Sequence, residues 1–428
     1  MTHWCWIGGV GLTLALSECQ AQPASGPGQA AQAIASRNMN PDVPAGDLEQ
    51  LVAGNSEFAW ALYQEVRRGQ GNIFYSPYSI STALAMTYAG ARGDTEQAMA
   101  RTMRYTLPQP RLHAAFDRLD LTLASRAKIE GAARSVEGFQ LNVANRIWSQ
   151  TGFSFLSAYL DTLAQNYASG LSLLDFKADP EAARRDINTW ASQQTAGRIK
   201  DLLPTGVIDS TTRLVLTNAI YFKAAWRTQF GTSATRDEPF HRLDGSSPSV
   251  RTMHQSARIP YASGADYQAL ELPYVGDQLA LAVILPAAGQ FTTFETDVDA
   301  RRVRTILDSL TPTQVDLALP KFKCEWAAAL KDVLSSLGMA SAFSSAADFS
   351  GMNGGEPRLV LQNVIHKSFV AVDEQGTEAA AATAVGVGLT AMPSRPVVVR
   401  IDRPFLFVIR DRSTGTLLFV GRILSPGE

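Results

Sequence analysis

The side chains that most often carry enzyme chemistry are present in this chain, but not in a catalytic or metal-binding arrangement. The five histidines, at positions 3, 113, 241, 254 and 366, do not have metal-ligand spacing. The sequence contains no Gly-x-Ser-x-Gly elbow, His-Glu-x-x-His, Cys-x-x-Cys or Walker loop. We therefore expect no catalytic residue, no bound metal and no cofactor, and the sequence gives no support to a hydrolase.

One segment matches a nucleotide-binding pattern by its glycines alone. Gly386–Ala391 has the spacing of a dinucleotide fingerprint, but that fingerprint needs a helix immediately after it. Met392–Pro396 follows instead, and its two prolines disfavour the start of a helix. We therefore interpret this segment as something other than a nucleotide site.

A long segment of small, almost uncharged residues surrounds these glycines and has a period of two. Alternate residues of a strand point to opposite faces, so one set would be buried if the segment entered a sheet. That set is Thr377, Ala379, Ala381, Thr383, Val385, Val387 and Leu389. Composition alone favours the other interpretation, a flexible Ala/Gly tether. A loop of this length in a compact chain is usually functional or disordered.

Predicted strands and helices must position this segment. Val364–Val372 before it, Pro404–Ile409 after it and Leu214–Phe222 are apolar runs typical of strands. Ser76, followed by a proline, is typical of a helix start, and we expect another helix near Trp326–Leu337. With 46% hydrophobic residues and no linker after about residue 46, the chain is predicted to form one large domain of mixed α and β structure.

Five or six motifs, in the same order along the chain, resemble the serpins, the serine-protease-inhibitor superfamily. Asp373–Thr383 is similar to the hinge of an inhibitory member, and Asp402–Ile409 is similar to the C-terminal core strand of the family. Asn218–Trp226 and Asn72–Ser81 resemble two further signatures. The resemblance covers residues 47–426. It implies an α+β fold: a single serpin-type domain over residues 47–428, with three β-sheets, about eight or nine helices and an exposed reactive-centre loop.

The resemblance also implies roles for individual residues, none of them catalytic. The hinge, which would enter the central sheet, comprises Glu374, Gly376, Thr377, Glu378, Ala379, Ala380, Ala381, Ala382 and Thr383. A polar cluster under the middle of that sheet, the shutter, would consist of Ser76, Ser79, Asn218 and His366. At the top of the sheet, the breach, Trp226 would lie beside an ion pair of Lys321 with Glu374. A core aromatic and an ordinary surface pair are the alternative interpretations of these breach residues.

The family's spacing from Gly376 places the scissile bond between Thr390 and Ala391. Leu389–Thr390 is the next candidate, followed by Ala391–Met392. These small or apolar residues match an elastase-like or subtilisin-like protease rather than a trypsin-like one.

The implied function is inhibition of a serine endopeptidase, trapped as a covalent acyl-enzyme when the cut loop inserts into the sheet. The alternative is a non-inhibitory serpin that acts as a carrier or chaperone. A net charge of −2 and the absence of a basic block predict neither nucleic-acid binding nor a heparin site. The target protease is the expected partner, and we expect a monomer.

The N-terminal region is predicted to direct export. Residues 1–21 have the apolar core of a signal peptide, with cleavage after Ala21, and residues 22–46 have the composition of a disordered tether. The resulting location is extracellular or periplasmic. The residues before Cys19 also resemble a lipoprotein box, so anchoring through that cysteine is the alternative. After cleavage Cys324 would be alone, which leaves no internal disulfide.

Overall fold

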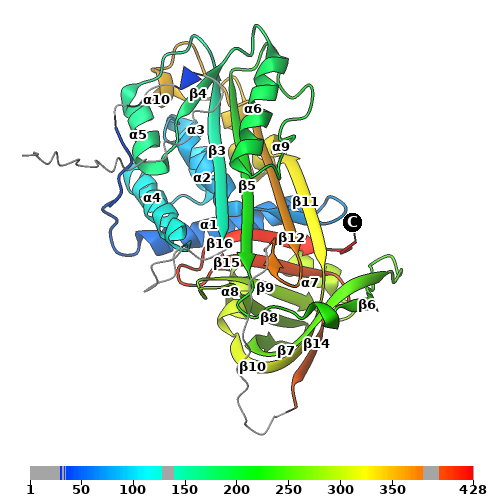
Figure 1. Cartoon of the computed structure of the whole chain (residues 1–428). Coiled ribbons are helices and arrows are strands. Elements are labelled where there is room, and N and C mark those ends of the chain that lie inside the picture. Colours follow the sequence, from blue (N-terminus) through cyan, green and yellow to red (C-terminus); the bar gives the residue numbers. More distant parts are fainter. Residues whose placement is uncertain (1–28, 31–32, 34, 128–138, 379–394, 428) are drawn as a thin grey trace, which may run out of the picture.

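The computed structural model describes residues 29–30, 33, 35–127, 139–378 and 395–427 (Figure 1). The predicted signal peptide, residues 1–21, lies outside the described residues. So do Ala379 to Thr383 of the predicted hinge and the candidate scissile residues Leu389, Thr390 and Ala391. No helix in the described ranges combines the length and the apolar character that crossing a bilayer requires.

A seven-stranded sheet forms the upper half of the molecule in Figure 1, where β3, β5, β12 and β11 run side by side. Its strands, in spatial order, are β1 (Gln29–Ala30), β4 (Leu171–Leu174), β3 (Gln140–Gln150), β5 (Leu214–Ala225), β13 (Gly376–Thr377), β12 (Asn363–Val372) and β11 (Phe322–Ala329). The two-residue strand β13 separates β5 from β12 only at one end. Over Val215–Tyr221 and Asn363–Phe369, β5 and β12 pair directly and in parallel.

The other strands form a second, nine-stranded sheet. In spatial order they are β14 (Val397–Arg400), β10 (Thr311–Pro320), β7 (Ser249–Ser263), β8 (Tyr267–Pro273), β9 (Leu279–Pro286), β15 (Phe405–Asp411), β16 (Leu417–Ile423) and β2 (Ile73–Tyr75), with β6 (Arg236–Pro239) beside β7. The long strand β7 belongs to two parts of this sheet, because Thr252–Tyr261 pairs with β10 and Tyr261–Ser263 pairs with β8. The three predicted sheets are therefore present, with the second and third joined through β7.

The described residues contain ten α-helical segments, two of them only four residues long. They are α1 (Asp47–Val66), α2 (Pro77–Tyr88), α3 (Gly93–Met103), α4 (Gln109–Ser125), α5 (Ser157–Tyr167), α6 (Pro180–Gln194), α7 (Phe291–Asp297), α8 (Ala300–Asp308), α9 (Lys331–Leu334) and α10 (Ser350–Asn353). The mixed α+β fold class is confirmed.

Both faces of the seven-stranded sheet are covered. On one face Trp190 of α6 packs in a buried cluster with Trp148 and Ala219 of the sheet. On the other face the fully buried helix α2 places Ser79 against Asn218. Because Asn218 and Ala219 are successive residues of β5, their side chains point to opposite faces, as the strand period requires.

The structure differs from two predictions, one about a helix and one about the N-terminal segment. Trp326–Leu337 is not one helix, because β11 continues through Ala329 and α9 begins only at Lys331. The helix propensity of the alanines is overridden there by pairing with β12 along the whole strand.

The second error concerns residues 35–46, which are ordered against α4 and α5 rather than a disordered tether. The main-chain N–H of Asn38 donates to the Gln165 carbonyl oxygen at 3.0 Å, and that of Ala35 donates to Asp161 Oδ1 at 2.9 Å. Hydrogen bonds to the helices therefore compensate for the few apolar residues of this segment.

Candidate functional site at the end and centre of the seven-stranded sheet

The predicted hinge enters the sheet at its first residues. Thr377 pairs with Ala224 of β5 on one side and with Val372 of β12 on the other, antiparallel to both strands. Gly376 has φ +154°, and a Cβ atom there would overlap the carbonyl oxygen of Ala224. Only glycine fits this approach without displacing β5.

Thr377 is completely buried below the sheet. Its Oγ1 lies 2.7 Å from the hydroxyl of Tyr274, whose ring stacks on Trp226 with centroids 4.7 Å apart and an interplanar angle of 10°. Trp226 in turn binds the chain just before the hinge, since its Nε1 donates to the Asp373 carbonyl oxygen at 2.9 Å. Two stacked aromatic rings thus support the point where the loop enters the sheet.

Glu374 is fixed from three directions next to this entrance. Lys321 Nζ lies 2.8 Å from Glu374 Oε2, and Thr235 Oγ1 donates to Oε1 at 2.7 Å. The Phe230 main-chain N–H donates to the Glu374 carbonyl oxygen at 3.0 Å. Burial raises the pKa of this carboxyl, but the hydrogen bonds from Lys321 and Thr235 outweigh it and the net pKa is lowered. The predicted ion pair between Lys321 and Glu374 is therefore present, and Thr235 adds a hydrogen bond to the same carboxylate.

Glu378 lies just beyond β13 with a left-handed backbone, φ +52°, and its contacts place its side chain on the face of the sheet opposite Thr377. Its carboxylate lies 3.2 Å from Arg198 Nε, in the connection between α6 and β5. Tyr221 completes this group: burial and then the hydrogen bond with Glu378 raise the pKa of its hydroxyl to about 12. The hinge is therefore held on both faces of the sheet.

The centre of the sheet contains a buried polar cluster where β5 and β12 pair directly. The Ser76 main-chain N–H donates to His366 Nε2 at 3.3 Å, so Nδ1 carries the ring proton and donates to Asn218 Oδ1. Asn218 Nδ2 donates to Ser79 Oγ at 2.5 Å. His366 is completely buried, and burial lowers its pKa to about 3, so the ring is neutral. The four predicted shutter residues thus meet in one network.

The family model described as "Serpin (serine protease inhibitor)" matches residues 53–426. The chain belongs to the serpin family. An uncharacterized serpin-like protein of Thermococcus kodakarensis is 41% identical over 385 residues, which are 90% of this chain and 87% of that one. The leukocyte elastase inhibitor of Xenopus laevis is 38% identical over 389 residues, covering 89% of this chain and all of that protein.

The fold of this serpin is also similar to that of solved family members. The crystal structure of the thermophilic serpin tengpin in the native state matches it with a TM-score of 0.81 and 26% identity, over 93% of this chain and 100% of tengpin. The three-sheet architecture inferred from the motifs is therefore that of known serpins.

Four residues of the serpin site were not predicted from the sequence: Tyr274, Thr235, Arg198 and Asn145. Asn145 belongs to the shutter network, since its Oδ1 accepts from Ser79 Oγ at 3.0 Å and its Nδ2 donates to the Ser79 carbonyl oxygen at 3.1 Å. A signal for it was available, because Asn145 is a polar residue at an inward position of an alternating strand. The other three approach from distant strands and loops and leave no local signal.

Proposed function

We propose that this serpin inhibits serine endopeptidases as a suicide substrate. The observation that carries the proposal is that the hinge already occupies a strand position between β5 and β12, which pair directly beyond it. Continued insertion would replace one parallel pairing by two antiparallel ones, which are slightly more stable per residue. The uncut chain would then be metastable, and cleavage of the loop would release it.

The register of β13 predicts where each loop residue would arrive. Six residues beyond Thr377, Thr383 would lie between Asn218 and His366, because each step along the loop moves one residue back along both strands. The side chain of Thr383 would then point toward the shutter, as the inward set of the alternation requires. Its hydroxyl would replace the direct Asn218–His366 hydrogen bond, so insertion would not leave these buried groups without a partner.

In the proposed mechanism, the reacting nucleophile comes from the target protease. Its serine would attack the carbonyl carbon of Thr390 and release the amine of Ala391, which leaves an acyl-enzyme. Insertion of the cut loop would carry the attached protease across the sheet and distort its active site before water removes the acyl group. The small or apolar residue at the bond and the elastase-inhibitor relatives support an elastase-like or subtilisin-like target.

A single incubation experiment tests this proposal. The purified chain is mixed with an elastase-like or a subtilisin-like protease, and the products are separated on a denaturing gel and analysed by mass spectrometry. We expect a band at the summed mass, a released peptide that begins at Ala391, and a Thr390→Arg variant that instead traps a trypsin-like protease. Clean cleavage without that band, and without a gain in thermal stability, would support the non-inhibitory carrier or chaperone.

We also propose that the protein is exported. Mass spectrometry of the mature chain should find an N-terminus at Gln22, and a lipid-modified Cys19 would support membrane anchoring instead. Either product keeps residues 35–46, which contact α4 and α5.

A further inference from the structure

A cavity of about 400 Å³ lies between the C-terminal end of α2 and the N-terminal ends of α4 and α5. Figure 1 shows α4 and α5 next to each other at the side of the molecule. The volume is within the range of small-molecule pockets, about 300–1,000 Å³. Part of the wall is apolar, and it is formed by Ala89, Pro110, Leu156 and Ala158. Leu156 is a large apolar residue, yet it is 43% exposed.

The cavity contains a buried polar group without a partner. His113 of α4 is only 4% exposed, and its Nδ1 lies 2.6 Å from the hydroxyl of Tyr167. A phenol hydroxyl has one proton to donate, so both groups are satisfied when Tyr167 donates to Nδ1 and the ring proton is on Nε2. Among the residues that the structure describes, Nε2 has no hydrogen-bond partner. His113 lines the cavity and Tyr167 does not, so Nε2 is the nitrogen that a ligand oxygen can approach.

The same cavity lies at the N-terminal ends of two helices that have no side-chain cap. Gln109, the first residue of α4, and Ala158, the second residue of α5, both line it. Neither Pro108 nor Leu156, at the two N-cap positions, accepts a hydrogen bond from the first turn through its side chain. The Gln109 side chain also donates to Glu96 at 2.8 Å and so compensates that carboxylate in part. The unpaired N–H groups and aligned peptide dipoles of two helix ends favour an anion.

A guanidinium group adds a positive charge to the wall of the cavity. Arg92 is exposed and follows α2 directly. Its Nη1 donates to the carbonyl oxygens of Ala89 and Ala91 at 3.1 Å and 2.6 Å, which offsets the negative end of that helix. A Cβ atom at Gly351 would overlap the guanidinium, so the glycine leaves the room in which Arg92 lies.

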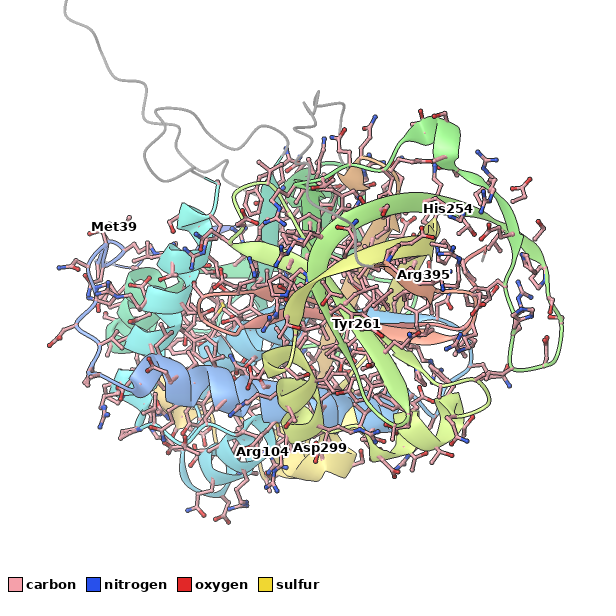
Figure 2. The ribbon with its side chains drawn as sticks, turned by 90° about the horizontal axis from the view of Figure 1, so that it is seen from below. Met39, Arg104, His254, Tyr261, Asp299 and Arg395 are labelled. Carbon is pink, nitrogen blue, oxygen red and sulfur yellow. The ribbon has the colours of Figure 1, made fainter. Side chains whose placement is uncertain are left out.

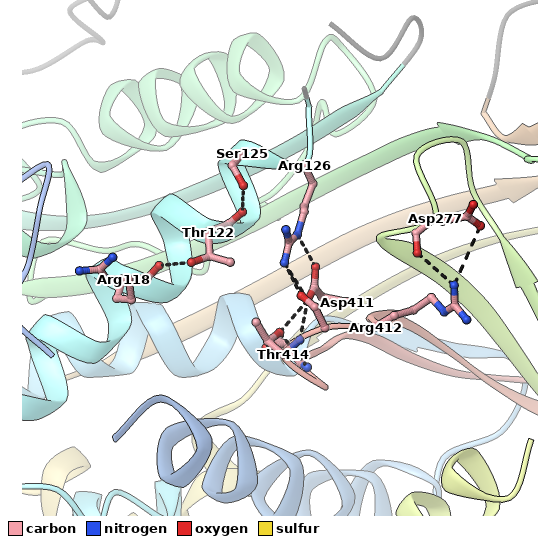
Figure 3. A network of polar contacts seen from close by, with 10 residues as sticks. Arg118, Thr122, Ser125, Arg126, Asp277, Asp411, Arg412 and Thr414 are labelled. Carbon is pink, nitrogen blue, oxygen red and sulfur yellow. Dashed lines mark hydrogen bonds and ion pairs between the residues drawn. The ribbon is translucent and has the colours of Figure 1, made fainter. Parts of the chain in front are cut away.

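Contacts outside the cavity fix the two helices that form most of it. At the far end of α4, which carries His113, Arg126 Nε lies 2.7 Å from Asp411 Oδ2 in β15 (Figure 3). At the start of α5, the Leu156 main-chain N–H donates to the Met352 carbonyl oxygen at 2.8 Å. The walls are therefore set by the fold before a ligand binds, as in most small-molecule sites.

We propose that this cavity binds a small apolar carboxylic acid. Its carboxylate accepts from His113 Nε2 beside the two helix ends, and Arg92 supplies the compensating charge. Its apolar part contacts Leu156 and Pro110. The site is independent of protease inhibition, because none of the hinge, shutter or breach residues lines the cavity.

Calorimetric titration of the purified full chain tests this proposal, with phenylacetate as the probe. Two further compounds separate its features, since phenylethanol lacks the charge and inorganic phosphate lacks the apolar part. We expect phenylacetate to bind at least about tenfold more tightly than either compound, because a hydrogen bond to a charged group is stronger than one to a neutral group. Absence of phenylacetate binding overturns the proposal. Equal binding of phenylethanol or phosphate overturns the assignment of a carboxylic acid.

Variants of the same chain show whether the probe occupies this cavity. His113→Gln and Arg92→Gln should each weaken phenylacetate binding about tenfold. Ala158→Trp should abolish it, because the indole would fill the cavity from an exposed position of its wall. This third variant leaves the buried residues intact, so it decides the question even if His113→Gln does not fold. Unchanged binding by Ala158→Trp overturns the proposal.

Arg104→Gln is the matched control for Arg92→Gln. Arg104 is also exposed at the end of a helix, where its Nη1 donates to the Arg101 carbonyl oxygen at 3.2 Å. It lines a different cavity, beside α1 (Figure 2). We expect no change in phenylacetate binding. A loss equal to that of Arg92→Gln would show an effect of net charge rather than of the cavity and would overturn the role of Arg92.

Discussion

The hydroxyl of Thr377 lies 2.7 Å from that of Tyr274, on the buried side of the seven-stranded sheet. Within the described part of the predicted hinge, Thr377 pairs with both β5 and β12. In the proposed mechanism, insertion of the loop would therefore start at Thr377.

Substitution of Thr377 by arginine should convert the inhibitor into a substrate. Thr377 has no exposed surface, so a guanidinium at this position would stay in solvent and keep the hinge out of the sheet. We expect the yield of covalent complex to fall at least tenfold while cleavage of the loop continues, as measured on denaturing gels. Gln375→Arg, two residues earlier and partly exposed, is the control. Undiminished trapping by Thr377→Arg would exclude this insertion mechanism.

Substitution of Gly376 by alanine should displace β13. The added methyl group would collide with the Ala224 carbonyl, and φ +154° is unfavourable for residues other than glycine. We expect faster hydrogen exchange at the Thr377 amide and a lower thermal midpoint of the uncut chain. Gly170→Ala is the control, because a Cβ atom there has no neighbour within 4 Å. Equal protection of Thr377 in both variants would contradict this.

Removal of Asn145 should open the shutter. Asn145→Ala leaves Ser79 and Asn218 with unsatisfied groups in a buried site, at a cost of about 1–3 kcal/mol each. We expect a lower thermal midpoint and faster spontaneous conversion to a urea-resistant form. Asn166→Ala, which removes only a partly buried bond to the Thr162 carbonyl, is the matched control. A shutter role for Asn145 is excluded if the two variants behave alike.

The stability of the native chain should fall as the pH drops below about 6.5. Burial lowers the pKa of His366 to about 3 and that of His113 to about 4, from a usual value of 6.5. The unfolded chain therefore binds more protons between these values, so the stabilisation is complete above pH 6.5 and is lost toward pH 3–4. Each histidine should account for about 2 kcal/mol at pH 5.

Thermal midpoints at pH 7.5 and pH 5.0 test this prediction. His113→Gln should remove about half of the pH dependence, because it leaves only His366. The exposed His241→Gln controls for the loss of a histidine as such. A pH dependence that is the same in all three chains would mean that these buried rings are not its source.

The sequence by itself, through its resemblance to the serpins, indicated several residues that the structure brings together, among them Lys321 with Glu374 and Asn218 with His366. Gly376, Asn218 and His366 were singled out by the motifs that resemble the serpins, whereas the strand period alone indicated only a mixed α and β protein. The same period correctly predicted that Thr377 would be buried, whereas Glu378, expected to face outward, has a side chain that is only 7% exposed and paired with Arg198. The face to which a strand residue points follows from the backbone geometry, and its ability to be buried follows from the size and polarity of its side chain. Both can be judged from the residue and its near neighbours in the sequence.

Only the tertiary structure decided what holds these residues in place. Tyr274, Thr235 and Arg198 reach the hinge from elements 103, 139 and 180 positions away in the chain. The alanines of β11 form a strand because β12 lies beside them, and the polar residues 35–46 are ordered because α4 and α5 accept their hydrogen bonds. Such partners are brought together by the fold, and no local pattern of residues specifies them.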